Sequence, residues 1–164
     1  MSIDPLQYRT VLGHFPTGVT VVTGMVDDEP VGFTIGSFTS VSLDPPLVGF
    51  LPMVDSDRWQ LLKRTTSFCV NILADGQDEL CWRFAKSSIE RPFEGVEWAP
   101  APVTGSPLIA GSLAWIDCSH EQIVDAGDHH FVMGRVEALG HDESASAPGA
   151  LVFFKGRLGG FDPH

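Results

Sequence analysis

The stretch that decides the fold reads Gly32-Phe-Thr-Ile-Gly-Ser-Phe-Thr-Ser-Val-Ser-Leu-Asp-Pro-Pro46. It leaves a β strand, passes through a glycine and several small hydroxyl side chains, and ends in Pro45-Pro46, which fixes how the chain enters the next strand. Backbone N–H groups and hydroxyls then lie close together, an arrangement that suits a flat heterocycle with carbonyl and ring-nitrogen acceptors. Taken alone, the same pattern is typical of an ordinary turn at a strand end.

Segments rich in β-branched residues lie on both sides of this stretch. Residues 19–23 and 31–35 form a predicted hairpin, because the turn-like Asp27-Asp-Glu-Pro30 separates them. Further strands are predicted at residues 47–51, 68–73, 113–118, 131–139 and 151–154. Many short antiparallel strands with few helices favour a closed or partly closed barrel, because closure removes sheet edges. The sequence therefore predicts a mainly β protein.

Three short helices interrupt the β pattern. Asp4 caps a helix that ends near Gly13, and Ser56 caps a second that ends near residue 63. A third covers residues 77–86, where apolar side chains fall four residues apart. The Pro-rich residues 99–107 are expected to form a surface loop, since they are too few to separate two domains.

The composition limits the possible partners. A chain of 164 residues is expected to form one domain over residues 1–164. A net charge of −11 and a pI near 4.7 make nucleic acid and anionic membranes poor partners. No signal peptide or membrane-length apolar run is recognised in the sequence, so a cytoplasmic protein is expected. Three cysteines without CxxC spacing predict buried free thiols and no metal site.

Two further motifs carry candidate chemistry. In Gly127-Asp128-His129 the imidazole can hydrogen-bond a carboxamide or phosphate while Asp128 orients it, although a polar turn reads the same way. Metal binding by His129 and His130 is disfavoured, because adjacent strand residues face opposite sides. On the third helix Arg83 can reach a phosphate while Phe84 packs inward, although an exposed Arg beside a core Phe is the commoner arrangement.

The order of the motifs carries more weight than any one of them. The chain resembles the short-chain flavin reductase family, the reductase components of two-component flavin monooxygenases, and especially those that serve aromatic and steroid-catabolic hydroxylases. The resemblance runs from about Tyr8 to Arg157 and rests on segments that begin at His14, Gly36, Ser56, Phe68, Arg83, Phe93, Gly105 and Gly127.

This resemblance implies an FMN-binding split barrel, a homodimer, and a flavin near the subunit interface. The flavin ring would be lined by Thr34, Ile35, Gly36, Ser37, Val41 and Ser42. The ribityl phosphate end would be held by Ser56, Arg58, Trp59, Arg83 and Phe84. Gly127, Asp128 and His129 would serve nicotinamide binding and hydride transfer. Leu158 stands where many relatives have Tyr, so no aromatic lid is assigned, and His130 leaves open which imidazole faces the nicotinamide.

The expected function is an NAD(P)H-dependent flavin reductase that supplies reduced FMN or FAD to a partner oxygenase. The hydride chemistry belongs to the two cofactors, and the protein's task is to stack one on the other. The alternatives are a flavin-binding electron carrier that does not oxidise NAD(P)H, and a related split-barrel enzyme for pyridoxine phosphate or a deazaflavin. The sequence leaves open FMN or FAD, NADH or NADPH, and whether the flavin is substrate or prosthetic group.

Overall fold

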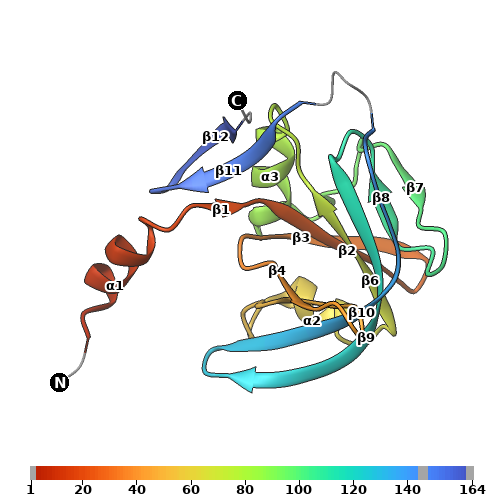
Figure 1. Cartoon of the computed structure of the whole chain (residues 1–164), viewed down its shortest axis with the longest axis horizontal. Coiled ribbons are helices and arrows are strands. Elements are labelled where there is room, and N and C mark those ends of the chain that lie inside the picture. Colours follow the sequence, from red (N-terminus) through yellow and green to blue (C-terminus); the bar gives the residue numbers. More distant parts are fainter. Residues whose placement is uncertain (1–2, 144–147, 162–164) are drawn as a thin grey trace.

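The structure is a computed structural model and describes residues 3–143 and 148–161. A seven-stranded antiparallel sheet forms its body, in the order β3-β2-β6-β9-β10-β5-β4 (Figure 1). The edge strands β3 and β4 follow each other along the chain without pairing, so the sheet curls into a barrel that stays split. Its strands are β2 (Thr20–Val26), β3 (Glu29–Ile35), β4 (Thr39–Ser42), β5 (Leu47–Phe50), β6 (Ser67–Ile72), β9 (Ala114–Ala126) and β10 (His129–His141).

Two small sheets and three helices complete the fold. The remaining strands are β1 (Thr17–Gly18), β11 (Ala150–Phe154) and β12 (Arg157–Phe161) in one sheet, and β7 (Trp98–Pro100) and β8 (Pro107–Ile109) in the other. The helices are α1 (Pro5–Leu12), α2 (Asp57–Leu62) and α3 (Asp78–Ala85). The predicted caps are confirmed, because Asp4 accepts backbone hydrogen bonds from Leu6 and Gln7, and Ser56 accepts one from Trp59.

The β2–β3 hairpin of the main sheet packs against a hydrophobic cluster on each face. Val22 and Phe33, which pair across β2 and β3, point to the cluster that contains Trp59 and Leu62 of α2. The neighbouring Val21 points to the other cluster, which contains Phe84 of α3. A side chain at Gly32 would meet the Phe84 ring at 3.2 Å, so this glycine lets α3 lie close to the sheet. The two helices therefore cover opposite faces of the β2–β3 hairpin.

The predicted β2–β3 hairpin is confirmed, but other boundaries were wrong. β9 and β10 are thirteen residues each and longer than predicted, and the short β1, β4 and β12 were not predicted as strands. Residues 99–107 are not a plain surface loop, since they link the paired strands β7 and β8. The buried carboxylate of Asp117 accepts hydrogen bonds from the backbone N–H groups of Val103 and Thr104, which fixes this hairpin to the main sheet.

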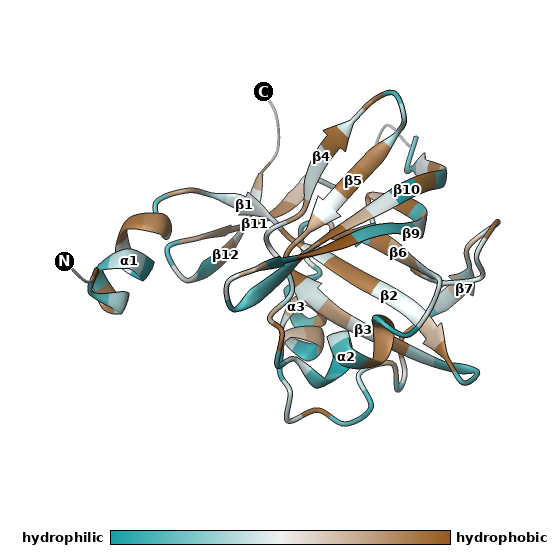
Figure 2. Ribbon diagram, turned by 90° about the horizontal axis from the view of Figure 1, so that it is seen from below, coloured by the Kyte–Doolittle hydropathy of each residue, from teal (hydrophilic) through white to brown (hydrophobic). Residues whose placement is uncertain are grey.

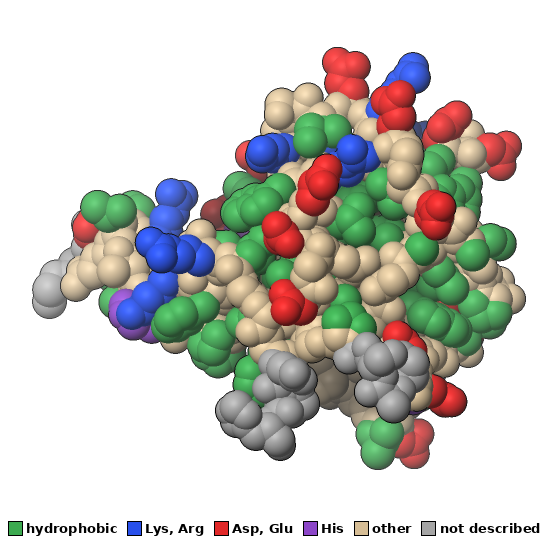
Figure 3. Space-filling model, turned by 90° about the horizontal axis from the view of Figure 1, so that it is seen from above, with side chains coloured by type: hydrophobic (Ala, Val, Ile, Leu, Met, Phe, Trp, Pro, Cys, Tyr) green, Lys and Arg blue, Asp and Glu red, His purple; other side chains and the backbone are tan. Residues whose placement is uncertain are grey.

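Helix α1 extends away from the sheets as an arm (Figures 1 and 2). None of its eight described residues is buried. Hydrophobic side chains lie on the arm and where it joins the body (Figure 3). Among the helices that the structure describes, none has both the length and the apolar character needed to cross a bilayer.

Candidate active site

A cavity of about 210 Å³ lies between β3 and α3. Thr34 and Gly36, two of the residues predicted to line a flavin, form one wall, and Trp82 and Ala85 of α3 form another. The Thr34 hydroxyl donates a 2.7 Å hydrogen bond to the carbonyl of Cys81, which ties the strand to the helix. The Cys81 thiol also lines the cavity, and burial, with a smaller contribution from Asp78, raises its pKa to about 11. The thiol therefore stays neutral and is no nucleophile at neutral pH.

A wider cleft of about 730 Å³ adjoins this cavity and shares Val19 and Gly36 with it. Ser37 lines the cleft, while Leu12 and Phe15 reach it from the arm. A side chain at Gly36 would come within 3.2 Å of the Thr17 hydroxyl, so the glycine keeps the junction of the two cavities open. Open space edged by backbone and hydroxyl groups fits a flat, acceptor-rich ring such as a flavin.

The other residues predicted to line the ring are placed differently. Ile35 is only 7% exposed and belongs to the core cluster on the α2 face. Val41 and Ser42 lie on the edge strand β4, and neither lines the cavity or the adjoining cleft. The structure therefore brings together Thr34, Gly36 and Ser37 at the candidate site.

The residues predicted for the phosphate end have structural contacts of their own. The Ser56 hydroxyl caps α2, and Trp59 has no exposed surface, so its side chain is a core residue that no ligand can contact. The Arg58 guanidinium donates to three backbone carbonyls, at Phe84 (2.8 Å), Lys86 (3.0 Å) and Ile89 (2.5 Å). Burial lowers the pKa of Arg58, and these hydrogen bonds satisfy the desolvated guanidinium.

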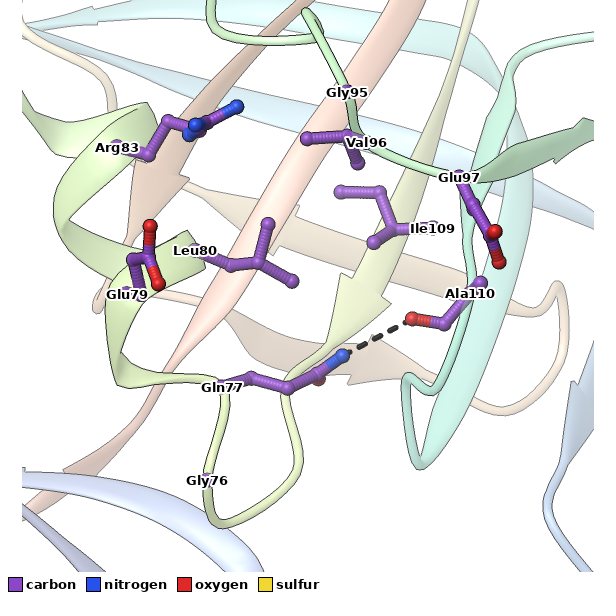
Figure 4. Close-up of a pocket in the computed structure, with 10 residues that line it drawn as sticks. All are labelled: Gly76, Gln77, Glu79, Leu80, Arg83, Gly95, Val96, Glu97, Ile109 and Ala110. Atoms are coloured by element: carbon purple, nitrogen blue, oxygen red, sulfur yellow. Dashed lines mark hydrogen bonds between the residues drawn. The ribbon is translucent and has the colours of Figure 1, made fainter.

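Arg83 lies on a different face of α3 from Trp82 and Ala85. It lines a separate cavity of about 370 Å³, together with the carboxylates Glu79 and Glu97 (Figure 4). Its guanidinium donates to the backbone carbonyl of Glu94. Phe84, next along the helix, is 1% exposed and packs against Phe93. The structure therefore does not bring Arg83 or the Phe84 side chain to the cleft that contains Gly36.

The Gly127-Asp128-His129 motif forms the tip of the β9–β10 hairpin. Ala126 pairs with His129, so Gly127 and Asp128 are the two turn residues, and Gly127 has φ +68°, a conformation that favours glycine. His129 Nδ1 lies 2.7 Å from Asp128 Oδ1. This hydrogen bond and the charge of His129 lower the pKa of Asp128, so the ionised carboxylate accepts a hydrogen bond from Nδ1–H. The Nε2 atom of His129 is left for a ligand.

The structure also separates the two histidines. The side chain of His129 is 35% exposed, whereas His130 is buried and accepts a 2.7 Å hydrogen bond at Nδ1 from the Trp59 indole. His129 is thus the more accessible imidazole of the two. In residues 3–143 and 148–161, the structure shows no cluster of three or more His, Cys, Asp or Glu side chains arranged to hold a metal.

Two consecutive residues link the candidate flavin wall to the hairpin tip. The Leu51 backbone donates to the Ser37 hydroxyl at 2.9 Å, and that hydroxyl donates back to the Leu51 carbonyl at 3.2 Å. The next residue, Pro52, accepts a 3.0 Å hydrogen bond from the backbone of His130. The two motifs that the sequence singled out, around Gly36 and around His129, are therefore held by one short segment.

Sequence reasoning missed several residues that line the cavities. Trp82 and Ala85 line the cavity beside β3, but neither is among the site residues predicted from the sequence. Ala85 lies one helical turn after Cys81 and therefore on the same face of α3, and both residues line the cavity. No sequence pattern marked Leu12 and Phe15 as cleft residues, because their place at the cleft depends on the position of the arm.

The fold and these cavities define a mainly β split-barrel protein with a candidate small-molecule site beside β3. The chain belongs to the family described as "Flavin reductase like domain", whose model matches residues 12–162. A flavin reductase of Pseudomonas putida is 47% identical over 161 residues, covering 98% of this chain and 92% of that protein.

Two further proteins are similar along nearly the whole chain. The reductase subunit HsaB of a flavin-dependent monooxygenase from Rhodococcus jostii is 44% identical over 162 residues, covering 99% of this chain and 80% of that protein. The structure of the NADH:FAD oxidoreductase SgcE6 of Streptomyces globisporus, in complex with NAD and FAD fragments, matches with a TM-score of 0.88 at 38% identity. That match covers 99% of this chain and 98% of the other.

Proposed function

We propose that this protein is an NADH-dependent flavin reductase that supplies reduced FMN or FAD to a partner oxygenase. The observation that carries the proposal is the link through Leu51 and Pro52, which joins the cleft at Gly36 and Ser37 to the tip that carries His129. A reductase needs a site for a flat ring and a second polar group that orients the hydride donor beside it.

Each part of the site has a distinct task. A bound flavin would supply the ring that accepts a hydride from NADH. Thr34, Gly36 and Ser37 would contact this ring through backbone groups and small side chains, and Trp82 would limit access from α3. With its Nδ1–H donating to the Asp128 carboxylate, neutral His129 would accept at Nε2 from a carboxamide N–H, and protonated His129 would donate to a carbonyl or phosphate oxygen.

The proposal includes a homodimer with two-fold symmetry. In α1, Leu6, Tyr8 and Val11 are each more than half exposed, and Leu12 and Phe15 are 52% and 75% exposed where they line the cleft. A second copy that covers this apolar arm would also enclose the cleft. A single domain over residues 1–164 and a cytoplasmic location, where NADH is supplied, belong to the same proposal.

A spectrophotometric assay with purified protein tests the activity. NADH and NADPH are each offered with FMN, FAD or riboflavin, and NADH consumption is followed. We expect NADH to be oxidised only when protein and flavin are both present. A protein that binds flavin and leaves both nucleotides unoxidised would instead be a split-barrel electron carrier.

A further inference from the structure

Behind the exposed His129 lies a buried hydrogen bond that the proposed activity does not by itself require. The Trp59 indole N–H donates to Nδ1 of His130 at 2.7 Å, and the two rings meet at 65° with centroids 5.9 Å apart. Trp59 is fully buried and His130 is 5% exposed, so the contact joins α2 to the hairpin tip inside the core.

This contact fixes the protonation pattern of His130. An indole nitrogen can only donate, so Nδ1 of His130 must be the acceptor. In the neutral ring the proton is therefore on Nε2, which lies 3.4 Å from a carboxylate oxygen of Asp125, an exposed residue on the opposite strand. An imidazolium could not accept the indole hydrogen bond, and a flipped ring would lose it.

The orientation of His130 determines that of its neighbour. Because strand residues alternate between faces, the side chain of His129 points outward when that of His130 points inward. The backbone supports the same arrangement, since His130 N–H donates to the Pro52 carbonyl and Val54 N–H donates to the Asp128 carbonyl, each at 3.0 Å. The tip is thus held by main-chain bonds at its edge and by one side-chain bond beneath it.

From this geometry we infer that His130 is a positioning residue, which holds the tip through the Trp59 hydrogen bond so that His129 meets the nicotinamide in one orientation. The inference rests on the proposed reductase function. It assigns His130 no contact with either cofactor. Loss of the indole–imidazole bond should loosen the tip and slow hydride transfer while flavin affinity is retained, because displacements near 1 Å already weaken catalysis strongly.

A matched pair of substitutions at His130 tests this inference. His130→Asn places its carbonyl oxygen where Nδ1 lies and can still accept from Trp59, whereas the longer side chain of His130→Gln places its oxygen farther out. Trp59→Phe removes the donor. Thr23→Val is the control for stability, since it removes a buried hydroxyl that donates to the Pro107 carbonyl.

Two measurements are made on folded protein. Anaerobic rapid mixing of the flavin-loaded variants with saturating NADH follows flavin bleaching, and proton NMR follows the Trp59 indole N–H signal, assigned by its loss in Trp59→Phe. We expect the wild type, Thr23→Val and His130→Asn to bleach at similar rates, and His130→Gln and Trp59→Phe to be slower by on the order of tenfold. The indole signal should move upfield in His130→Gln and remain near its original position in His130→Asn.

Equal bleaching rates in His130→Asn, His130→Gln and wild type would overturn the positioning role, even with an active enzyme. An indole signal that does not respond to either substitution would overturn the hydrogen bond itself. A wild type that leaves NADH unoxidised would contradict the proposed function and remove this inference with it.

Discussion

At the scale of single residues, His129 carries the most specific expectation. Its replacement by Ala should leave the fold and flavin affinity nearly intact, because the side chain is partly exposed and its hydrogen bond is to Asp128, the adjacent residue in the turn. NADH turnover should fall about tenfold to a hundredfold, which corresponds to about 1–3 kcal/mol for one lost positioning hydrogen bond. Rapid mixing with NADH measures the rate of hydride transfer. An unchanged rate would mean that Gly127-Asp128-His129 is only a structural turn.

The sequence and the structure give different expectations for the effect of replacing Arg83. The sequence predicts that Arg83→Ala weakens binding of FMN more than that of riboflavin, which lacks a phosphate. The structure instead places Arg83 in a cavity that Glu79 and Glu97 also line and that does not include Thr34 or Gly36. We therefore expect the two flavins to be affected equally. Fluorescence titration of both flavins decides the question, and a selective loss of FMN affinity would restore the phosphate assignment.

His120 makes stability depend on pH. Burial beside Trp59 and Phe68 lowers its pKa below the usual 6.5, so the folded protein keeps this ring neutral. As the pH falls through about 6.5, the unfolded chain takes up a proton that the folded chain does not, and the free energy of unfolding decreases by at most about 1.4 kcal/mol per pH unit. Urea unfolding at a series of pH values should show a shallower decrease in His120→Phe than in wild type. If the free energies of unfolding of wild type and His120→Phe changed with pH in parallel, His120 would not be the cause of the pH dependence.

At the scale of elements, Arg58 holds α2 against the C-terminal end of α3 and the segment that follows it. Its guanidinium donates to carbonyls at Phe84, Lys86 and Ile89, so its loss leaves three carbonyls without this donor. Arg58→Ala should lower the free energy of unfolding by about 2 kcal/mol, since charge-assisted hydrogen bonds are among the stronger ones. Hydrogen exchange should increase first in residues 84–89. An equal increase in hydrogen exchange across the whole chain would argue against a local stabilising role of Arg58.

The elements that the sequence predicted correctly are those with local causes. Asp4 and Ser56 cap helices through their own side chains, and Asp27 and Asp28, both with positive φ, close the β2–β3 hairpin. The hairpin of β7 and β8 was missed, because its anchor is Asp117, a residue distant in sequence. The full length of β9 was missed for a related reason, since its outer half is polar and depends on pairing with β10 for its structure.

At the scale of the whole molecule, the site was predicted only in part. The motifs pointed to Thr34, Gly36 and Ser37, which line the cavities, and to the hairpin tip at His129, and the connection of the two through Leu51 emerged from the fold. Their roles toward a flavin and a nicotinamide stay predictions. The phosphate end stays a prediction whose proposed side chains are largely engaged elsewhere. Hydroxyl and guanidinium groups read alike in a sequence whether they cap a helix, clamp a loop or bind a phosphate.

The number of chains in the assembly cannot be read from the structure of one chain. The exposed arm, with Leu6 at 72% and Phe15 at 75% exposure, leads us to expect a dimer of two identical chains. Light scattering at micromolar concentration should give twice the mass of 17.8 kDa. Removal of α1 should shift the protein toward monomer and lower its flavin affinity, because Leu12, at the end of this helix, lines the cleft. A fully active monomer would contradict the interface proposed for the arm.

The most direct test of the central claim is a single anaerobic titration. Purified protein with a stoichiometric amount of FMN or FAD is mixed with NADH in the absence of oxygen, and flavin bleaching is recorded together with NADH loss. We expect one flavin to be reduced for each NADH oxidised, far faster than in a mixture without protein. Flavin that stays oxidised at the rate of the protein-free control would contradict the assignment of this protein as a flavin reductase.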